Sequence, residues 1–85
     1  MIPPLIKKAI DAHVLRGQEC GNFTTCVLEN DLAGAIGYAD ENSLASIRYI
    51  VLYCWNHIPS PCWGSKKKVK EWREKGGDAF AHIEP

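Results

Sequence analysis

The chain has 85 residues, of which 46% are hydrophobic and 24% are charged, and its formal net charge at pH 7 is zero. This length predicts a single domain, residues 1–85, and the hydrophobic content argues against a disordered chain. A neutral chain also lacks the basic surplus of a general nucleic-acid-binding protein. The charge is uneven, however: residues 1–45 carry three basic and six acidic residues, whereas residues 46–85 carry seven basic and four acidic residues. This polarity favours self-association or a charged partner.

The first predicted helix covers residues 3–16. Pro3 and Pro4 suit its first turn, where no backbone N–H donor is needed. Gly17 is a favourable C-terminal stop. Apolar and aromatic residues recur between them at helical spacing, which predicts this buried face: Leu5, Ile6, Ala9, Ile10, His13 and Val14.

The second predicted helix covers residues 23–38 and follows a turn at Gly21 and Asn22, with Asn22 as its N-cap. Gly34 and Gly37 lie inside it, where each costs about 1 kcal/mol relative to alanine. They either allow another helix to approach closely or mark a weak helix end. Its predicted buried face is Phe23, Val27, Leu28, Leu32, Ala35 and Ile36.

The third predicted helix, residues 41–58, has the longest apolar periodicity in the chain. Asp40 caps its first turn, and Pro59 ends it. The pattern predicts a helix that lies between its neighbours at the centre of the domain, with this stripe buried: Leu44, Ile47, Val51, Cys54 and Ile58.

The last predicted helix covers residues 66–75, begins after Ser65 as its cap and buries Val69 and Trp72 on one face. The tail, residues 78–85, has no sustained period. Because strand alternation is absent, the sequence predicts an all-α fold, a compact four-helix domain with a central apolar helix.

Cys20, Cys26, Cys54 and Cys62 are spaced too widely for the short paired hooks of structural zinc sites. We therefore expect separate reduced thiols, with no metal and no cofactor. The prolines near Met1 interrupt any signal sequence, and residues 41–58 are too short and polar to span a membrane. A cytoplasmic location follows as an expectation.

Catalysis has little support in the sequence. Cys54 and His57 lie one helical turn apart, but no orienting acid or glycine-rich oxyanion loop accompanies them. We therefore predict that the chain is not an enzyme and has no catalytic residue.

A tryptophan followed by a basic run is the strongest candidate binding surface. The lysines crowd a helix start, where free N–H groups could receive an anion or a carboxylate-rich surface, although such a run can also be a solvated helix face. The candidates for binding a partner or an anion are Trp63, Ser65, Lys66, Lys67, Lys68, Lys70 and Arg73. A second candidate is a polar pocket of Asn30, Asp31 and Asn56, against the alternative that such residues cap helix ends. Asp31 could also bond the 62–65 loop.

Three segments carry a wider pattern: GNF and VLENDL at residues 21–32, ADEN at residues 39–42, and IP, CWGS and Trp72 between residues 58 and 72. Together they resemble the GGFL, NDL, AD-E-N and CWGS pattern of a family of small phage and prophage proteins without an assigned activity. The resemblance covers about residues 10–77. Asn22 departs from it, because the family often has a second glycine there.

The resemblance implies expression in an infected or lysogenic bacterium, and by analogy a protein that binds host machinery. We therefore predict a phage or mobile-element accessory protein that binds a host protein of a defence system, as an anti-CRISPR-like inhibitor would. Two alternatives stay open: an oligomeric binder, or sponge, of a nucleotide signal, and a nucleic-acid-binding accessory protein that uses the basic last helix. A homo-oligomer is also possible.

Overall fold

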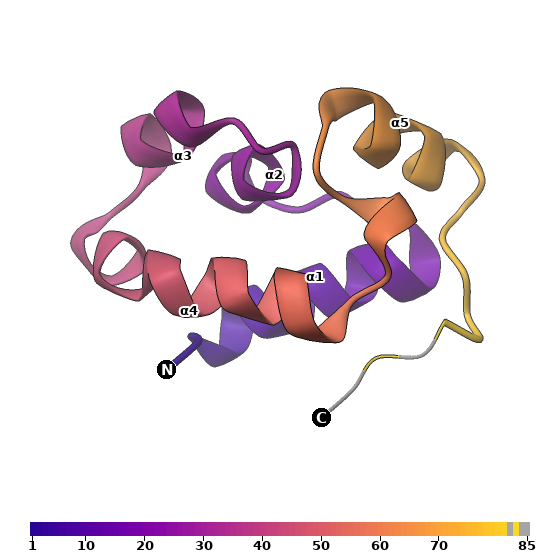
Figure 1. The fold of residues 1–85 in the computed structure, drawn as a ribbon, viewed down its shortest axis with the longest axis horizontal. Helices are drawn as coiled ribbons and strands as arrows, with labels where there is room; N and C mark the ends of the chain where they lie inside the picture. Colours follow the sequence, from indigo (N-terminus) through magenta and orange to yellow (C-terminus); the bar gives the residue numbers. More distant parts are fainter. Residues whose placement is uncertain (82, 84–85) are drawn as a thin grey trace.

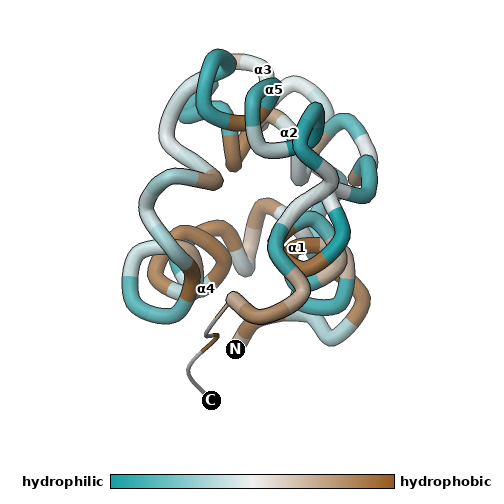
Figure 2. Tube along the Cα trace, turned by 90° about the vertical axis from the view of Figure 1, so that its right-hand side faces the viewer, coloured by the Kyte–Doolittle hydropathy of each residue, from teal (hydrophilic) through white to brown (hydrophobic). Residues whose placement is uncertain are grey.

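The computed structural model describes residues 1–81 and 83, and within them it is entirely helical, as the sequence predicts. Its elements are α1 (Pro4–Arg16), α2 (Asn22–Leu28), α3 (Leu32–Tyr38), α4 (Glu41–His57), the 3-10 helix η1 (Ser60–Cys62) and α5 (Lys66–Glu74). Figure 1 shows α1 and α4 in one layer and α2, α3 and α5 in a second layer. Figure 2, which looks along these layers, shows hydrophobic residues mainly in α1 and α4, whereas the outer side of the second layer is mostly hydrophilic.

Helix α1 begins and ends as predicted. Pro4 occupies the first turn, and Gly17 ends the helix in the left-handed conformation (φ 66°) that glycine adopts readily. Ile10, His13 and Val14 are fully buried, but Leu5 is 81% exposed, so the predicted face is buried only in its C-terminal half.

The predicted helix at residues 23–38 is wrong as a single element, because the chain breaks it into α2 and α3. Asn30 takes a left-handed φ of 59°, which short polar side chains tolerate better than most. Asp31 then caps α3 by accepting a 2.9 Å hydrogen bond from the N–H of Gly34. Helix capping, the alternative that the sequence offered for the polar residues, is therefore the role of Asp31, at a break inside the predicted helix. Asn22 likewise does not cap α2, which begins after Gly21 without a side-chain cap.

Helix α4 is the longest helix. It does not lie at the centre of the domain as predicted, and its predicted apolar stripe is only partly buried. Its buried residues are Ile50, Tyr53 and Cys54, whereas Leu44 and Val51 are 48% and 40% exposed. The buried face is therefore rotated from the predicted stripe. The cause lies in the fold: the layer of α2, α3 and α5 covers α4 from one side only (Figure 2).

A polar contact joins α4 to α1. The Tyr53 hydroxyl donates to the carboxylate of Asp11, which also pairs with Lys7 across one helical turn at 2.9 Å. Burial and this carboxylate raise the pKa of Tyr53 above its usual range, so the phenol stays protonated.

Helix α5 buries Val69 and Trp72, as predicted. The indole N–H of Trp72 donates to two carbonyl oxygens at the end of α1, those of His13 at 3.1 Å and Val14 at 3.0 Å. The chain after α5 then returns to α1, where the N–H of Asp78 donates to the same Val14 oxygen at 3.0 Å. Of the predicted tail, residues 82, 84 and 85 lie outside the described residues.

The buried imidazole of His13 connects three elements. Its Nε2 lies 2.8 Å from the carbonyl oxygen of Cys62, and its Nδ1 accepts a 3.4 Å hydrogen bond from Nε of Arg73. A carbonyl can only accept, so Nε2 carries a proton. Because Nδ1 accepts from Arg73, it carries none, and the ring is therefore neutral. Burial lowers the pKa of His13, and the nearby Arg73 charge adds to this effect.

Within residues 1–81 and 83, no helix combines the length and apolar composition needed to cross a membrane.

The two glycines of α3 should respond in opposite directions to alanine. A Cβ on Gly34 would lie 2.8 Å from the Sγ of Cys26, whereas a Cβ on Gly37 would meet nothing within 4 Å. We expect Gly34→Ala to destabilise the fold by about 1–3 kcal/mol through overpacking, and Gly37→Ala to stabilise it by roughly 0.5 kcal/mol or more through helix propensity. Urea denaturation of both variants measures the difference, and equal effects would contradict the α2–α3 packing.

His13 should make the fold less stable in mild acid. Because its folded-state pKa is below the ordinary 6.5, the unfolded chain binds a proton first as the pH falls. Stability is therefore fully present above about pH 6.5 and declines below it. Urea denaturation from about pH 7.5 to 5.5 measures this slope. His13→Gln, which does not titrate, is the control, and the same slope in that variant would refute the assignment.

Candidate functional site

The segment between α4 and α5 positions the main site. Pro59 and Pro61 restrict the backbone around the short helix η1, and the thiol of Cys62 donates to the carbonyl oxygen of Pro59 at 2.9 Å. His13 holds the carbonyl oxygen of Cys62 from the core side. The chain then leaves the core in an extended conformation at Trp63, so the indole projects from a fixed support.

One backbone contact fixes this segment against α2. The N–H of Gly64 donates to the carbonyl oxygen of Leu28 at 2.6 Å. Gly64 has a φ of 111°, a conformation that disfavours side chains. The structure therefore joins the predicted segments at 27–32 and 62–65, but through Leu28. The predicted bond from Asp31 is wrong, because its carboxylate caps α3.

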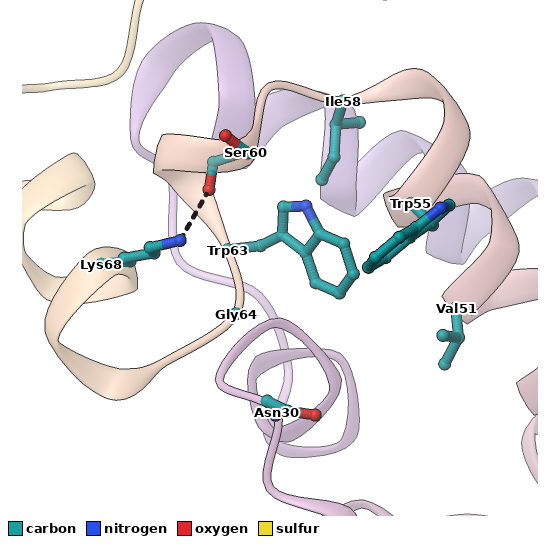
Figure 3. Close-up of a pocket in the computed structure, with 8 residues that line it drawn as sticks. All are labelled: Asn30, Val51, Trp55, Ile58, Ser60, Trp63, Gly64 and Lys68. Atoms are coloured by element: carbon teal, nitrogen blue, oxygen red, sulfur yellow. Dashed lines mark hydrogen bonds between the residues drawn. The ribbon is translucent and has the colours of Figure 1, made fainter.

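A cavity of about 530 Å³ lies between α4, the end of α2 and the segment before α5 (Figure 3). We call it the Trp pocket. The rings of Trp55 and Trp63 meet edge to face inside it, with centroids 6.3 Å apart. Trp55 is 75% exposed, and Trp63 is half-buried. Its lining residues are Asn30, Val51, Trp55, Ile58, Ser60, Trp63, Gly64 and Lys68.

The Trp pocket continues towards α3 as a shallower apolar hollow. The two cavities share Asn30 and Val51, and the second one is also lined by Leu32, Ala35 and Ile47. Leu32 is 70% exposed beside it. The result is a groove along α4 with apolar walls.

A cluster of exposed lysines on α5, here called the lysine rim, follows the Trp pocket in the chain, and one of them, Lys68, lines the pocket. Lys66, Lys67, Lys68 and Lys70 are all exposed on α5. Lys68 Nζ donates to the backbone oxygen of Ser60 at 3.5 Å, which holds this ammonium group beside the pocket (Figure 3). Lys67 and Lys70 approach Glu71 and Glu74 at 4.0 Å and 3.9 Å between mostly exposed side chains, and such pairs neutralise little charge.

Two members of the predicted basic surface have structural roles. Ser65 caps α5 by accepting a hydrogen bond from the N–H of Lys68 at 3.1 Å. Arg73 turns inward, where it donates to His13 and, at 3.2 Å, to the hydroxyl of Thr25. The surface available to a partner is therefore the four exposed lysines and Trp63.

The predicted polar pocket is not assembled. Asn30 lines the Trp pocket, and Asp31 lies beside it as a helix cap. Asn56 lines a separate small hollow with Tyr49 and His57. Asn56 lines a different hollow of α4 from the ones that Asn30 and Asp31 line, so the three side chains do not share one pocket. Which side of α4 the α2–α3 break approaches depends on the tertiary fold.

The cysteines are free thiols, and three of them are buried: Cys26, Cys54 and Cys62. Burial raises the pKa of Cys54 to about 12 and that of Cys62 to about 11. A thiol is a nucleophile only as thiolate, so neither is activated at neutral pH. No group of three or more potential metal ligands occurs among residues 1–81 and 83.

Sequence reasoning missed the importance of Trp55 and Val51. The sequence pattern places Val51 in the buried stripe of the third predicted helix, and Trp55 is not among the predicted site residues. Trp55 follows Val51 by four residues and so lies near it on the helix surface, but only the fold shows that this side of α4 is open.

Comparisons of the chain with protein-family models, with curated proteins and with solved structures give no match. The resemblance to small phage proteins therefore remains a prediction.

Trp55 and Trp72 should differ in their contribution to stability. Trp72 is 6% exposed and Trp55 is 75% exposed. We expect Trp72→Ala to cost about 3–5 kcal/mol, or to prevent folding, and Trp55→Ala to change the unfolding free energy by less than about 0.5 kcal/mol. Urea denaturation followed by circular dichroism tests both. A large loss for Trp55→Ala would mean that this side chain belongs to the core.

Proposed function

We propose that this chain is a non-enzymatic accessory protein of a phage or mobile element. It acts in the host cytoplasm by binding a host protein of a defence system, as an inhibitor of that system. The mobile-element assignment rests on the sequence pattern at residues 21–72. The binding assignment rests on one observation, the exposed tryptophan beside an apolar groove and a lysine rim.

The groove suits a protein segment as its occupant. Tryptophan is among the residues that contribute most to protein interfaces, particularly where a pocket lets it be desolvated by the partner. Trp55 is already held against Trp63, so less side-chain freedom is lost on binding. Apolar walls at Val51 and Ile58 continue the same surface.

The positive charge of the lysine rim further restricts the kind of protein that can bind. Four exposed lysines stand on one short helix, and their only ion pairs among the described residues are at 3.9 Å or longer. Lysines at a helix start also repel the positive end of the helix dipole, so a carboxylate there relieves an unfavourable arrangement. The partner is therefore a protein with an apolar segment flanked by acidic residues.

A nucleotide is the second candidate ligand, and one observation favours it. Aromatic faces at Trp55 and Trp63, with the ammonium group of Lys68 at the same cavity, could stack a base and neutralise a phosphate. The cavity of about 530 Å³ is within the usual size range for small-molecule sites. A thermal-shift screen with linear and cyclic nucleotides tests this, since a ligand of the folded state raises the melting temperature.

Reversing the lysine rim should abolish partner binding without harming the fold. Lys66→Glu, Lys67→Glu and Lys68→Glu together place acids at the start of α5, where they favour the helix. Trp55→Ala should weaken binding by about 2 kcal/mol or more, roughly 30-fold. Phe80→Ala is the matched control, because Phe80 is an aromatic residue that is 96% exposed and does not line the Trp pocket.

The tagged variants are compared in pull-downs from a bacterial lysate, and the captured protein is then titrated by calorimetry at low and high salt. The proposal requires one protein that the wild type and Phe80→Ala retain and that both groove variants lose, with weaker binding at high salt. A captured protein that all variants retain equally would refute the assignment of this surface.

A further inference from the structure

The groove along α4 carries opposite charges at its two ends. Lys68 lines it at the Trp pocket, and Asp31 lines the hollow beside α3. Figure 3 shows Lys68 on one side of the two indole rings and Val51, which both cavities share, on the other side. Asp31 accepts the capping hydrogen bond of α3, but this bond does not remove the negative charge of the carboxylate. The groove is therefore basic at one end and acidic at the other.

The length of the groove fits about two turns of a second helix. Ile47 lines the hollow beside α3, and Trp55 follows it by eight residues and lines the Trp pocket. Eight residues of α4 extend about 12 Å along its axis. Side chains at positions i, i+4 and i+7 of another helix lie on one face and extend over about 10 Å. Three apolar side chains of a bound helix can therefore follow the groove from one cavity to the other.

The walls of the groove offer a bound segment no row of backbone partners. One wall is α4, and the other contains Leu32 and Ala35 of α3. The part of the chain that the structure describes has no β-strand, so a bound segment cannot extend a sheet and must satisfy its backbone groups in another way. An α-helix bonds its own backbone groups, and an amphipathic helix in an apolar groove is a common mode of recognition.

The two charges favour one orientation of such a helix. Acidic residues are favourable in the first turn of a helix and basic residues in its last turn, because of the helix dipole. Since α4 runs towards the Trp pocket, where its C-cap Ile58 lies, an antiparallel helix would begin beside Lys68 and end beside Asp31. Both of its favourable terminal charges would then meet an opposite charge of the groove. In the parallel orientation, each end would need the charge that its own dipole disfavours.

We propose that the partner segment is an amphipathic α-helix that lies antiparallel to α4, with an acidic first turn beside Lys68 and a basic last turn beside Asp31. Its apolar residues at helical spacing enter the groove, and the first of them contacts Trp55 and Trp63. This inference rests on the proposed function of the groove and adds the kind of segment that the groove accepts.

A selection from a displayed library of random peptides, each about four helical turns long, tests the shape of the occupant. The wild-type chain selects peptides, and those that also bind Trp55→Ala are discarded, so that the remaining peptides need the Trp pocket. We expect them to share apolar residues at helical spacing between an acidic first turn and a basic last turn. Peptides without helical spacing, such as P-x-x-P sequences that form polyproline II, would overturn the proposal. So would a selection in which no peptide remains.

Fluorescence anisotropy with the tightest selected peptide tests the helix and its orientation. Proline at the centre of the peptide should weaken binding at least about 100-fold, and circular dichroism should show that the peptide becomes helical in the complex. A peptide with its two charged turns exchanged should bind the wild type at least about tenfold more weakly and should recover binding to Lys68→Glu. Lys8→Glu is the matched control, because Lys8 is exposed on α1 and does not line the groove. A central proline without effect would refute the helix, and an exchanged peptide that binds the wild type equally well would refute the orientation.

The outcomes also separate this inference from the proposed function. Helical peptides that need Trp55, combined with pull-downs that capture no host protein, would support the helix and refute the proposed function. A captured host protein that occupies the groove with an extended segment would support the proposed function and refute the helix.

Discussion

The fold depends on the hydrogen bonds that the backbone carbonyl groups at the C-terminal end of α1 accept from other parts of the chain. The last carbonyl groups of a helix lack partners within it, and here the oxygens of His13 and Val14 accept from the indole of Trp72. The imidazole of the same His13 bonds the backbone of η1 and accepts from Arg73. One buried turn therefore holds α5 and the segment before it. Because these polar groups are buried, each must remain bonded, and removing one leaves an unpaired group at a cost of about 1–3 kcal/mol.

This arrangement explains where the candidate site comes from. The backbone of Cys62 is held by His13 from one side, and Gly64 is held by Leu28 from the other. Trp63 lies between these two contacts, so its position is set by the core, although its ring is half-buried at the surface. The lysines follow directly on α5, whose opposite face is fixed by Trp72. A site on such a support loses little conformational entropy when a partner binds.

A second consequence of this fold is that part of the apolar surface stays exposed. The chain folds around a core whose fully buried side chains include Ile10, Leu28 and Ile50, but it leaves one side of α4 uncovered. A small domain buries a limited share of its surface, and here the uncovered share is concentrated on one helix. The groove with the Trp pocket is part of this surface.

Local features of this protein follow from the sequence alone. Interactions within a few residues, or strong apolar character, set the helical class, the ends of α1 at Pro4 and Gly17, the cap of α4 at Asp40 and the burial of Trp72. The break at Asn30 was also encoded locally, in two side chains that compete with helical bonds. Tertiary structure alone decided which face of α4 is covered, that Arg73 points inward, and that Leu28 meets Gly64. Periodicity shows that a helix has an apolar face, but burial depends on which distant segments pack against it, and those contacts are not local.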